Sequence, residues 1–214
     1  MAISTFGELK SAVENWLART DQSSRTPEFI SLAEAEINRR LFVREMESRA
    51  TASTVAGTGY IALPTSSANF LRLIRLQYTY SSSIVVMHQL PAHQLSFEYP
   101  STTTGMPESY AVIGGEIQLR PVPDAVYSLE ATYMNRVAAL SDSNTPALFT
   151  NNPDLYLYGA LKHAMPFINE MDEAGRFQQF SSLFDECLEY QLQADKRGRW
   201  GGGPLVIRSD VGNP

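Results

Sequence analysis

The spacing of hydrophobic residues changes twice along the chain and predicts a helical, a strand-rich and a second helical section. Between residues 1 and 48, apolar side chains recur every three to four positions, the period of one face of an α-helix. We expect two helices here. A capping box of Thr5 and Glu8 opens the first, and Thr26-Pro27-Glu28 opens the second with a capping hydroxyl, a proline and an acidic residue.

The middle of the chain has a different pattern. From about residue 49 to residue 136 it is rich in Thr, Ser, Val, Ile and Tyr, residues that favour strands. Gly114-Gly115 predicts a tight hairpin because glycine adopts positive φ angles, and residues 78–84 suggest a second hairpin. The candidate strands are residues 50–55, 60–63, 70–80, 84–89, 109–113, 116–120 and 127–136.

A helical period returns near residue 150. Asn152-Pro153-Asp154 opens one helix, and another is expected from about residue 171 to residue 196. Each helix pair is too small to bury its apolar face alone, so the two pairs are expected to pack together. The sequence therefore predicts an α+β fold. It consists of a four-helix domain (residues 1–48 and 150–196), a β-rich insertion (49–149) and an extended C-terminal arm (197–214).

The predicted arm carries apolar residues, although chain ends are usually polar. Three glycines, 201–203, form a flexible joint before an apolar run. The arm either folds back onto its own domain or docks on another chain, and an arm that docks is typical of an assembly component. We expect it to be disordered in the isolated protein. The residues predicted to bind a partner are Trp200, Leu205, Val206, Ile207 and Arg208.

Composition narrows the possible functions. A hydrophobic content of 43% and a charged content of 19% are those of a soluble globular protein, and no apolar run approaches the length of a membrane span. The single Cys187 excludes an intramolecular disulfide framework. The net charge of −6 argues against tight sequence-independent binding of nucleic acid, which requires a basic surface.

The sequence offers little for catalysis, metals or cofactors. Residues 57–62 match the letters of a dinucleotide-binding fingerprint, but they lead into strand-like residues and Pro64 where that fingerprint requires a helix, so a hairpin turn is expected. His88 and His93 are five residues apart, which does not place two ligands on one helical face. Cys187 lies on an apolar stripe, as a small core residue would. We expect no enzyme activity, no cofactor and no metal.

Seven of the ten tyrosines fall in the strand-rich section. Such a density is typical of the half-buried lining of a small sheet, and it could also form a contact face for carbohydrate or protein. These residues are Tyr60, Tyr78, Tyr80, Tyr99, Tyr110, Tyr127 and Tyr133.

Several segments, in this order, resemble the head-to-tail adaptor proteins of tailed bacteriophages, also called connector or neck proteins. The family often has a P-x-D-F-L step, whereas this chain has a short insertion between Pro64 and Phe70 and lacks the aspartate. The resemblance covers about residues 5–195. The segments that carry it are residues 5–13, 25–41, 60–64, 70–74, 107–110, 116–123 and 152–161.

The resemblance implies a structural virion protein, made in the host cytoplasm and located in the neck between capsid and tail. Such adaptors usually form a dodecameric ring beneath the portal and lengthen the DNA channel. The implied partners are the portal protein, neighbouring adaptor subunits, downstream tail or nozzle proteins, and passing genomic DNA bound without sequence specificity. No membrane is implied.

Two other functions stay open at this stage. One is a different ring component of the same particle, a stopper or tail-completion protein. The other is a carbohydrate-binding or protein-binding module, or a small enzyme, that uses the Tyr-rich section and would need a concave pocket with converging polar groups.

Overall fold

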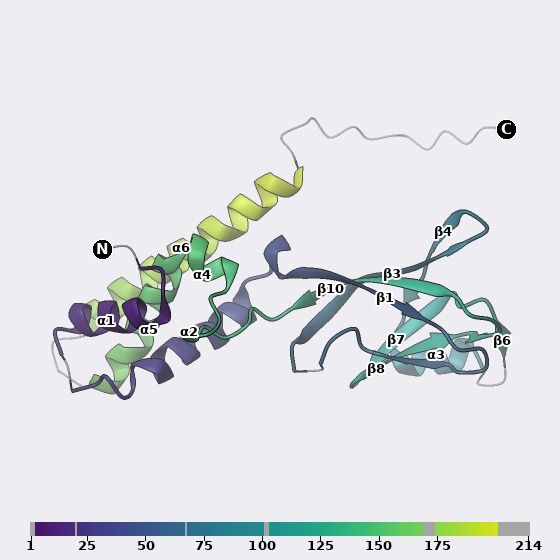
Figure 1. Ribbon diagram of the computed structural model, residues 1–214, viewed down its shortest axis with the longest axis horizontal. Helices are drawn as coiled ribbons and strands as arrows, with labels where there is room; N and C mark the ends of the chain where they lie inside the picture. The colour runs from purple at the N-terminus through teal and green to yellow at the C-terminus, as the bar shows by residue number, and fades with distance from the viewer. Residues whose placement is uncertain (1–2, 20, 67, 101–102, 169–173, 201–214) are drawn as a thin grey trace. The chain divides into compact units, whose positions relative to one another are not determined.

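The chain forms two compact units. In this computed structural model, the residues described are 3–19, 21–66, 68–100, 103–168 and 174–200. Unit 2, here called the β unit, comprises residues 45–138, and unit 1, the helical unit, combines the chain before and after it (Figure 1). Each unit has its own core. In the described parts of the chain, no helix is both long enough and apolar enough to span a membrane.

The helical unit is built around α5. This helix is buried on nearly all sides, and it packs against α1, α2, α4 and α6. Gly159 allows α2 and α6 to approach α5 closely, because a Cβ atom there would lie 2.8 Å from Ala33 Cβ and 2.9 Å from the Phe184 ring. The helices are α1 (Phe6–Leu17), α2 (Thr26–Arg40), α4 (Ala147–Asn151), α5 (Pro153–Ile168) and α6 (Ala174–Trp200).

Two helix ends test the capping predictions. The capping box of α1 is confirmed, since the Glu8 backbone N–H donates to Thr5 Oγ1 and the Thr5 N–H donates to the Glu8 carboxylate. The capping role predicted for Thr26 is wrong. Thr26 is already helical, Arg25 precedes it without a side-chain cap, and the Thr26 hydroxyl donates backwards to the Gln22 carbonyl.

The β unit consists of two four-stranded sheets and a strand pair. Sheet 1 is antiparallel, in the order β1 (Glu47–Ser53), β10 (Ser128–Asn135), β3 (Phe70–Tyr80), β4 (Ser83–Val86). Sheet 2 has the order β2 (Tyr60–Ala62), β8 (Glu116–Arg120), β7 (Ser109–Ile113), β5 (His88–Gln89), with β5 parallel to β7. β6 (Thr104–Gly105) and β9 (Val122–Pro123) form a parallel pair, η1 (Arg44–Met46) is a 3-10 turn, and α3 (Ala92–Glu98) contacts β7.

The hairpins predicted at Gly114-Gly115 and at residues 78–84 are confirmed. Gly114, with a φ of +58°, lies in the turn between β7 and β8. Ser81 and Ser82 turn β3 into β4, and both have positive φ angles. Positive φ at both central residues matches the right-handed twist of the flanking strands.

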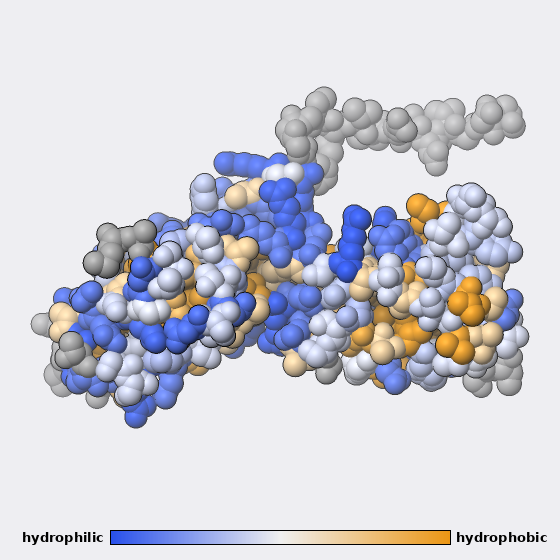
Figure 2. Space-filling view, in the orientation of Figure 1, coloured by the Kyte–Doolittle hydropathy of each residue, from blue (hydrophilic) through white to orange (hydrophobic). Residues whose placement is uncertain are grey.

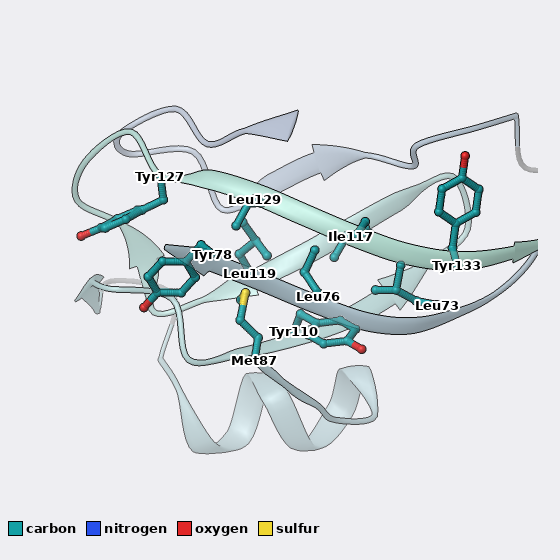
Figure 3. Packing of buried hydrophobic residues seen from close by; sticks show 11 residues of the cluster. Leu73, Leu76, Tyr78, Met87, Tyr110, Ile117, Leu119, Tyr127, Leu129 and Tyr133 are labelled. Atoms are coloured by element: carbon teal, nitrogen blue, oxygen red, sulfur yellow. The ribbon is translucent and has the colours of Figure 1, made fainter. Parts of the chain in front are cut away.

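The core of the β unit comes from residues that alternate along the strands (Figure 3). In β10, Leu129, Ala131 and Tyr133 are buried, and the residues between them are more exposed. Sheet 2 contributes Ile117 and Leu119 from β8. Four of the seven tyrosines of this section are buried, as a sheet lining requires: Tyr78, Tyr110, Tyr127 and Tyr133.

The predicted four-helix domain with a β insertion is wrong, although the fold is α+β. The described residues form six α-helices and ten strands in three sheets. Asn152 separates α4 from α5, two helices where the sequence predicted one helix start at Asn152-Pro153-Asp154. The strands close over a hydrophobic core of their own. In addition, α6 continues to Trp200, so residues 197–200, which were expected in the arm, are helical.

Candidate functional site

The residues predicted to bind a partner lie at and beyond the end of α6. Trp200 is the last residue of this helix. Leu205, Val206, Ile207 and Arg208 lie outside the described residues. Their contact with a portal or a neighbouring subunit therefore stays a prediction, and the structure contributes the point from which the arm begins.

The base of the arm is held by a buried carboxylate. The Asp195 side chain is only 8% exposed, and it accepts hydrogen bonds from the Arg44 backbone N–H at 2.9 Å and from Arg199 Nε at 2.5 Å. Burial acts to raise the pKa of Asp195, but these hydrogen bonds outweigh it, so the pKa lies below its ordinary value. The last turns of α6 are thereby tied to the segment that follows α2.

We expect the Asp195→Ala substitution to destabilise the helical unit by about 1–3 kcal/mol, because it leaves the Arg44 N–H without its acceptor. The β unit, residues 45–138, contains no tryptophan, so a change in tryptophan fluorescence during urea unfolding reports on the helical unit. Asp185→Ala is the matched control. It removes an exposed ion pair with Arg40 and should cost less than about 1 kcal/mol. Equal losses from the two variants would contradict the role of Asp195.

A second ionic cluster joins α2, α5 and α6. Glu36 accepts from Lys162 at 2.7 Å and from Arg40 at 2.9 Å, and His163 Nε2 lies 3.1 Å from it. Arg40 also reaches Asp185 on α6 at 2.6 Å. Burial raises the pKa of Glu36, but the hydrogen bonds from Lys162 and Arg40 outweigh burial and leave the pKa below its usual range. Burial lowers the pKa of His163, so this ring is neutral at pH 7.

Glu36 should make the helical unit sensitive to acid. Because its folded-state pKa is lowered, the carboxylate stabilises the fold above pH 4.5, and this contribution is lost as the pH falls through the folded-state pKa. We expect Glu36→Gln to cost about 1.5–3 kcal/mol at pH 7, and the difference from wild type to shrink below pH 4.5. Urea unfolding at several pH values measures this. Glu28→Gln, which alters an exposed pair, is the control, and a gap that stays constant with pH would contradict the assignment.

Cys187 lacks the surroundings of a catalytic nucleophile. Its Sγ donates to Asp154 Oδ2 at 3.4 Å. Burial, together with the Asp154 carboxylate, raises the pKa of the thiol to about 12. The thiolate, which is the reactive form, is therefore scarce at neutral pH.

The thiol of the folded chain should react slowly with iodoacetamide. The thiolate fraction at pH 8 falls about 1,000-fold when the pKa rises from 9.0 to about 12. We expect a corresponding fall in alkylation rate relative to the urea-unfolded chain, measured by mass spectrometry. In a Cys187→Ser background, Val86→Cys on an exposed strand should react at the ordinary rate. Similar rates for Cys187 in the folded and unfolded chain would contradict this.

The other candidate ligands do not converge. His88 lies on β5 and His93 on α3, and both are exposed. Within the described part of the chain, no three His, Cys, Asp or Glu residues gather as a metal site would require. The dinucleotide-like letters at residues 57–62 lead into β2 and not into a helix, so the fingerprint interpretation fails. The hairpin expected there is also wrong, because β1 and β2 belong to different sheets and do not pair with each other.

Exposed apolar side chains mark possible interfaces on the helical unit. Trp16 is 50% exposed, and its ring packs edge-on against Tyr158 and Phe180, each at 6.1 Å between centroids. Beside it, a shallow pocket of about 380 Å³ lies on the outer face of α1. Its lining includes the small residues Gly7, Ser11 and Ala12. The helical spacing of apolar residues in α1 includes Trp16. The buried stripe is real for Leu9, Val13 and Leu17, but Trp16 lies at its rim.

The β unit also carries an exposed apolar end. Val55 is 61% exposed and Val126 is 71% exposed. Hydrogen bonds of Thr54 to Ala125 and Tyr127 hold their two segments together. Figure 2 shows hydrophobic residues gathered on the visible face of this unit. The sequence pattern does not predict this surface. It places Val55 in the candidate strand 50–55, whereas β1 ends at Ser53, and Val126 lies outside any periodic run.

A groove between β1 and β2 is the third surface. Its volume is about 390 Å³, and its lining is mainly alanine, leucine and isoleucine side chains, among them Ala50, Ala52, Ile61 and Leu63. None of the three surfaces combines converging polar groups with a shielded reactive side chain. They are suited to contacts with other chains.

The comparisons with known proteins agree with this. No curated protein matches the chain. Among protein families, residues 4–208 match the family described as SU10 adaptor protein, which covers almost the whole chain. The resemblance to bacteriophage head-to-tail adaptors is thereby confirmed, and the chain belongs to the SU10 adaptor protein family.

Proposed function

We propose that this protein is the head-to-tail adaptor of a tailed phage, and that several copies form a ring beneath the portal that joins the capsid to tail components. The observation that carries the proposal is the family match over residues 4–208. In the virion neck such a ring extends the DNA channel, and its neighbours are the portal protein and the next tail or nozzle proteins. The role is structural, without catalysis.

A closed ring needs two different surfaces on each copy, because neighbouring subunits meet head to tail. The chain offers such surfaces in each unit. The helical unit has the α1 pocket beside Trp16, and the β unit has the apolar end formed by Val55 and Val126. Apolar patches of this kind are typical of binding sites.

The arm would add the contact with the portal or the next subunit. Burying Trp200, Leu205, Val206 and Ile207 gives on the order of 6–10 kcal/mol. Ordering the arm costs about 1–2 kcal/mol for each residue. A single arm therefore binds weakly, whereas a dozen arms held in a ring bind together through their effective concentration.

The charge of the protein suits a conduit for DNA. With a net charge of −6, the chain lacks the excess of basic residues that holds DNA phosphates tightly. Genomic DNA could slide through such a ring without sequence-specific contacts during packaging and ejection.

The test is reconstitution with the portal protein of the same genome, imaged by electron microscopy. The full chain is compared with a chain that stops after Trp200, where α6 ends. We expect rings under the portal with the full chain and few or none with the shortened chain. If both the full and the shortened chain form rings, the adaptor role stands and the arm is not needed for ring assembly. No ring with either chain would overturn the proposed function.

A further inference from the structure

The groove between β1 and β2 lies where the two sheets of the β unit are open. β1 is the first strand of sheet 1, and β2 is the first strand of sheet 2. Among the described residues, each of these strands pairs on one side only, β1 with β10 and β2 with β8. Edge strands of this kind present unpaired backbone N–H and C=O groups to any extended segment beside them.

Small side chains keep the groove open. Ala50 belongs to the layer that faces the core, and Ala52 follows it two positions on. On the neighbouring strand β10, Ala131 lies opposite Ala50 and is small as well, whereas the larger Leu129 lies opposite Ala52. Behind the groove lie the core residues Leu76, Ile117 and Leu129 (Figure 3). Apolar side chains entering the groove would therefore extend an existing hydrophobic core.

Residues 204–208 of the chain have the sequence of a suitable occupant. Leu205 and Ile207 are two positions apart, so in an extended segment they point to one face while Val206 and Arg208 point to the other. Pro204 stands at the first position of the run, where a strand tolerates proline. Residues 201–203 are glycines, which allow the segment to adopt a new direction after α6.

We propose that residues 204–208 of a neighbouring copy add as a strand along β1 and place Leu205 and Ile207 in the β1–β2 groove. This rests on the proposed ring, which brings a second copy beside each chain. Main-chain hydrogen bonds to the free edge supply affinity, and the groove selects the side chains. The interaction would be weak between free chains and strengthened in the ring, where linkage can raise avidity by about 10²–10⁴-fold.

Binding to the groove can be measured without any ring. The ¹⁵N-labelled chain ending at Trp200 is titrated with a synthetic peptide of residues 201–214, at concentrations of about 1 mM and above. We expect NMR shift changes confined to β1, β2 and Leu63. Ala50→Leu, which fills the groove, should abolish them, whereas Thr79→Leu, on an exposed position of β3, should leave them intact. No shift change, or changes in the helical unit alone, would overturn the proposal.

A disulfide test then identifies which copy supplies the strand. In a Cys187→Ser background, an acceptor chain with Ala52→Cys that ends at Gly203 is mixed with a full-length donor chain carrying Ile207→Cys, and both are assembled on the portal. We expect a cross-linked pair of chains, which Ala50→Leu in the acceptor abolishes. If a full-length chain carrying both cysteines forms only an intramolecular disulfide, the added strand comes from the same copy and the role of a neighbour is wrong. Rings without any cross-link would overturn this inference and leave the proposed function standing.

Discussion

Replacing Gly159 by leucine is expected to destabilise the helical unit by about 3 kcal/mol or more, the largest loss we predict for this unit. Gly159 lies where α2, α5 and α6 meet, and even one added carbon would lie 2.8 Å from Ala33 Cβ and 2.9 Å from the Phe184 ring. These neighbours belong to packed helices, so the leucine can be accommodated only if the helices separate. The measurement is urea unfolding of the full chain, followed by tryptophan fluorescence.

Two comparisons make the Gly159 result specific. Gly159→Ala should cost less than leucine, because a smaller clash is partly offset by a gain in helix propensity of about 1 kcal/mol. Gly175→Ala in α6 meets no atom within 4 Å, so it should be neutral or slightly stabilising. If Gly159→Leu unfolds at the same urea concentration as wild type, the close approach of the three helices is wrong.

Leu119→Ala should have the largest effect in the β unit, a loss of about 2–5 kcal/mol. Leu119 is fully buried in β8, between the two sheets, and its truncation leaves a cavity in the core shown in Figure 3. Hydrogen exchange measured by mass spectrometry resolves the two units. We expect faster exchange in sheets 1 and 2 and unchanged exchange in α2, α5 and α6.

The control for Leu119 is Val126→Ala, an apolar truncation at a site that is 71% exposed. It should change stability by no more than about 0.5 kcal/mol. Faster exchange throughout both units in Leu119→Ala would show that the units unfold together, contrary to the separate cores described here.

Local signals in the sequence predicted the local structure. The capping box at Thr5 and the hairpin at Gly114-Gly115 depend on residues within a few positions of each other, and both were found. Pairing across long separations leaves no such signal. β1 pairs with β10 some eighty residues later, for example Glu47 with Met134, and this pairing turns the strands into a two-layered unit with its own core.

In the candidate site, too, features that depend on neighbouring residues could be predicted and those that depend on long-range pairing could not. The arm was recognised from Trp200 and the apolar run after the glycines, because composition alone makes it unusual. The β1–β2 groove could not be predicted. Ala50 and Ala52 read as ordinary strand residues, and their small size matters only because two sheet edges lie beside each other. Likewise, the sequence did not indicate a structural role for Asp195, because its hydrogen-bond donor Arg44 lies about 150 residues earlier in the chain.

The pairing of Glu47 with Met134 sets the start of β1 beside the end of β10. The chain therefore enters and leaves the β unit at neighbouring points, the arrangement in which whole domains tolerate insertion into a host. A unit attached in this way can be exchanged as a whole without rebuilding the helices.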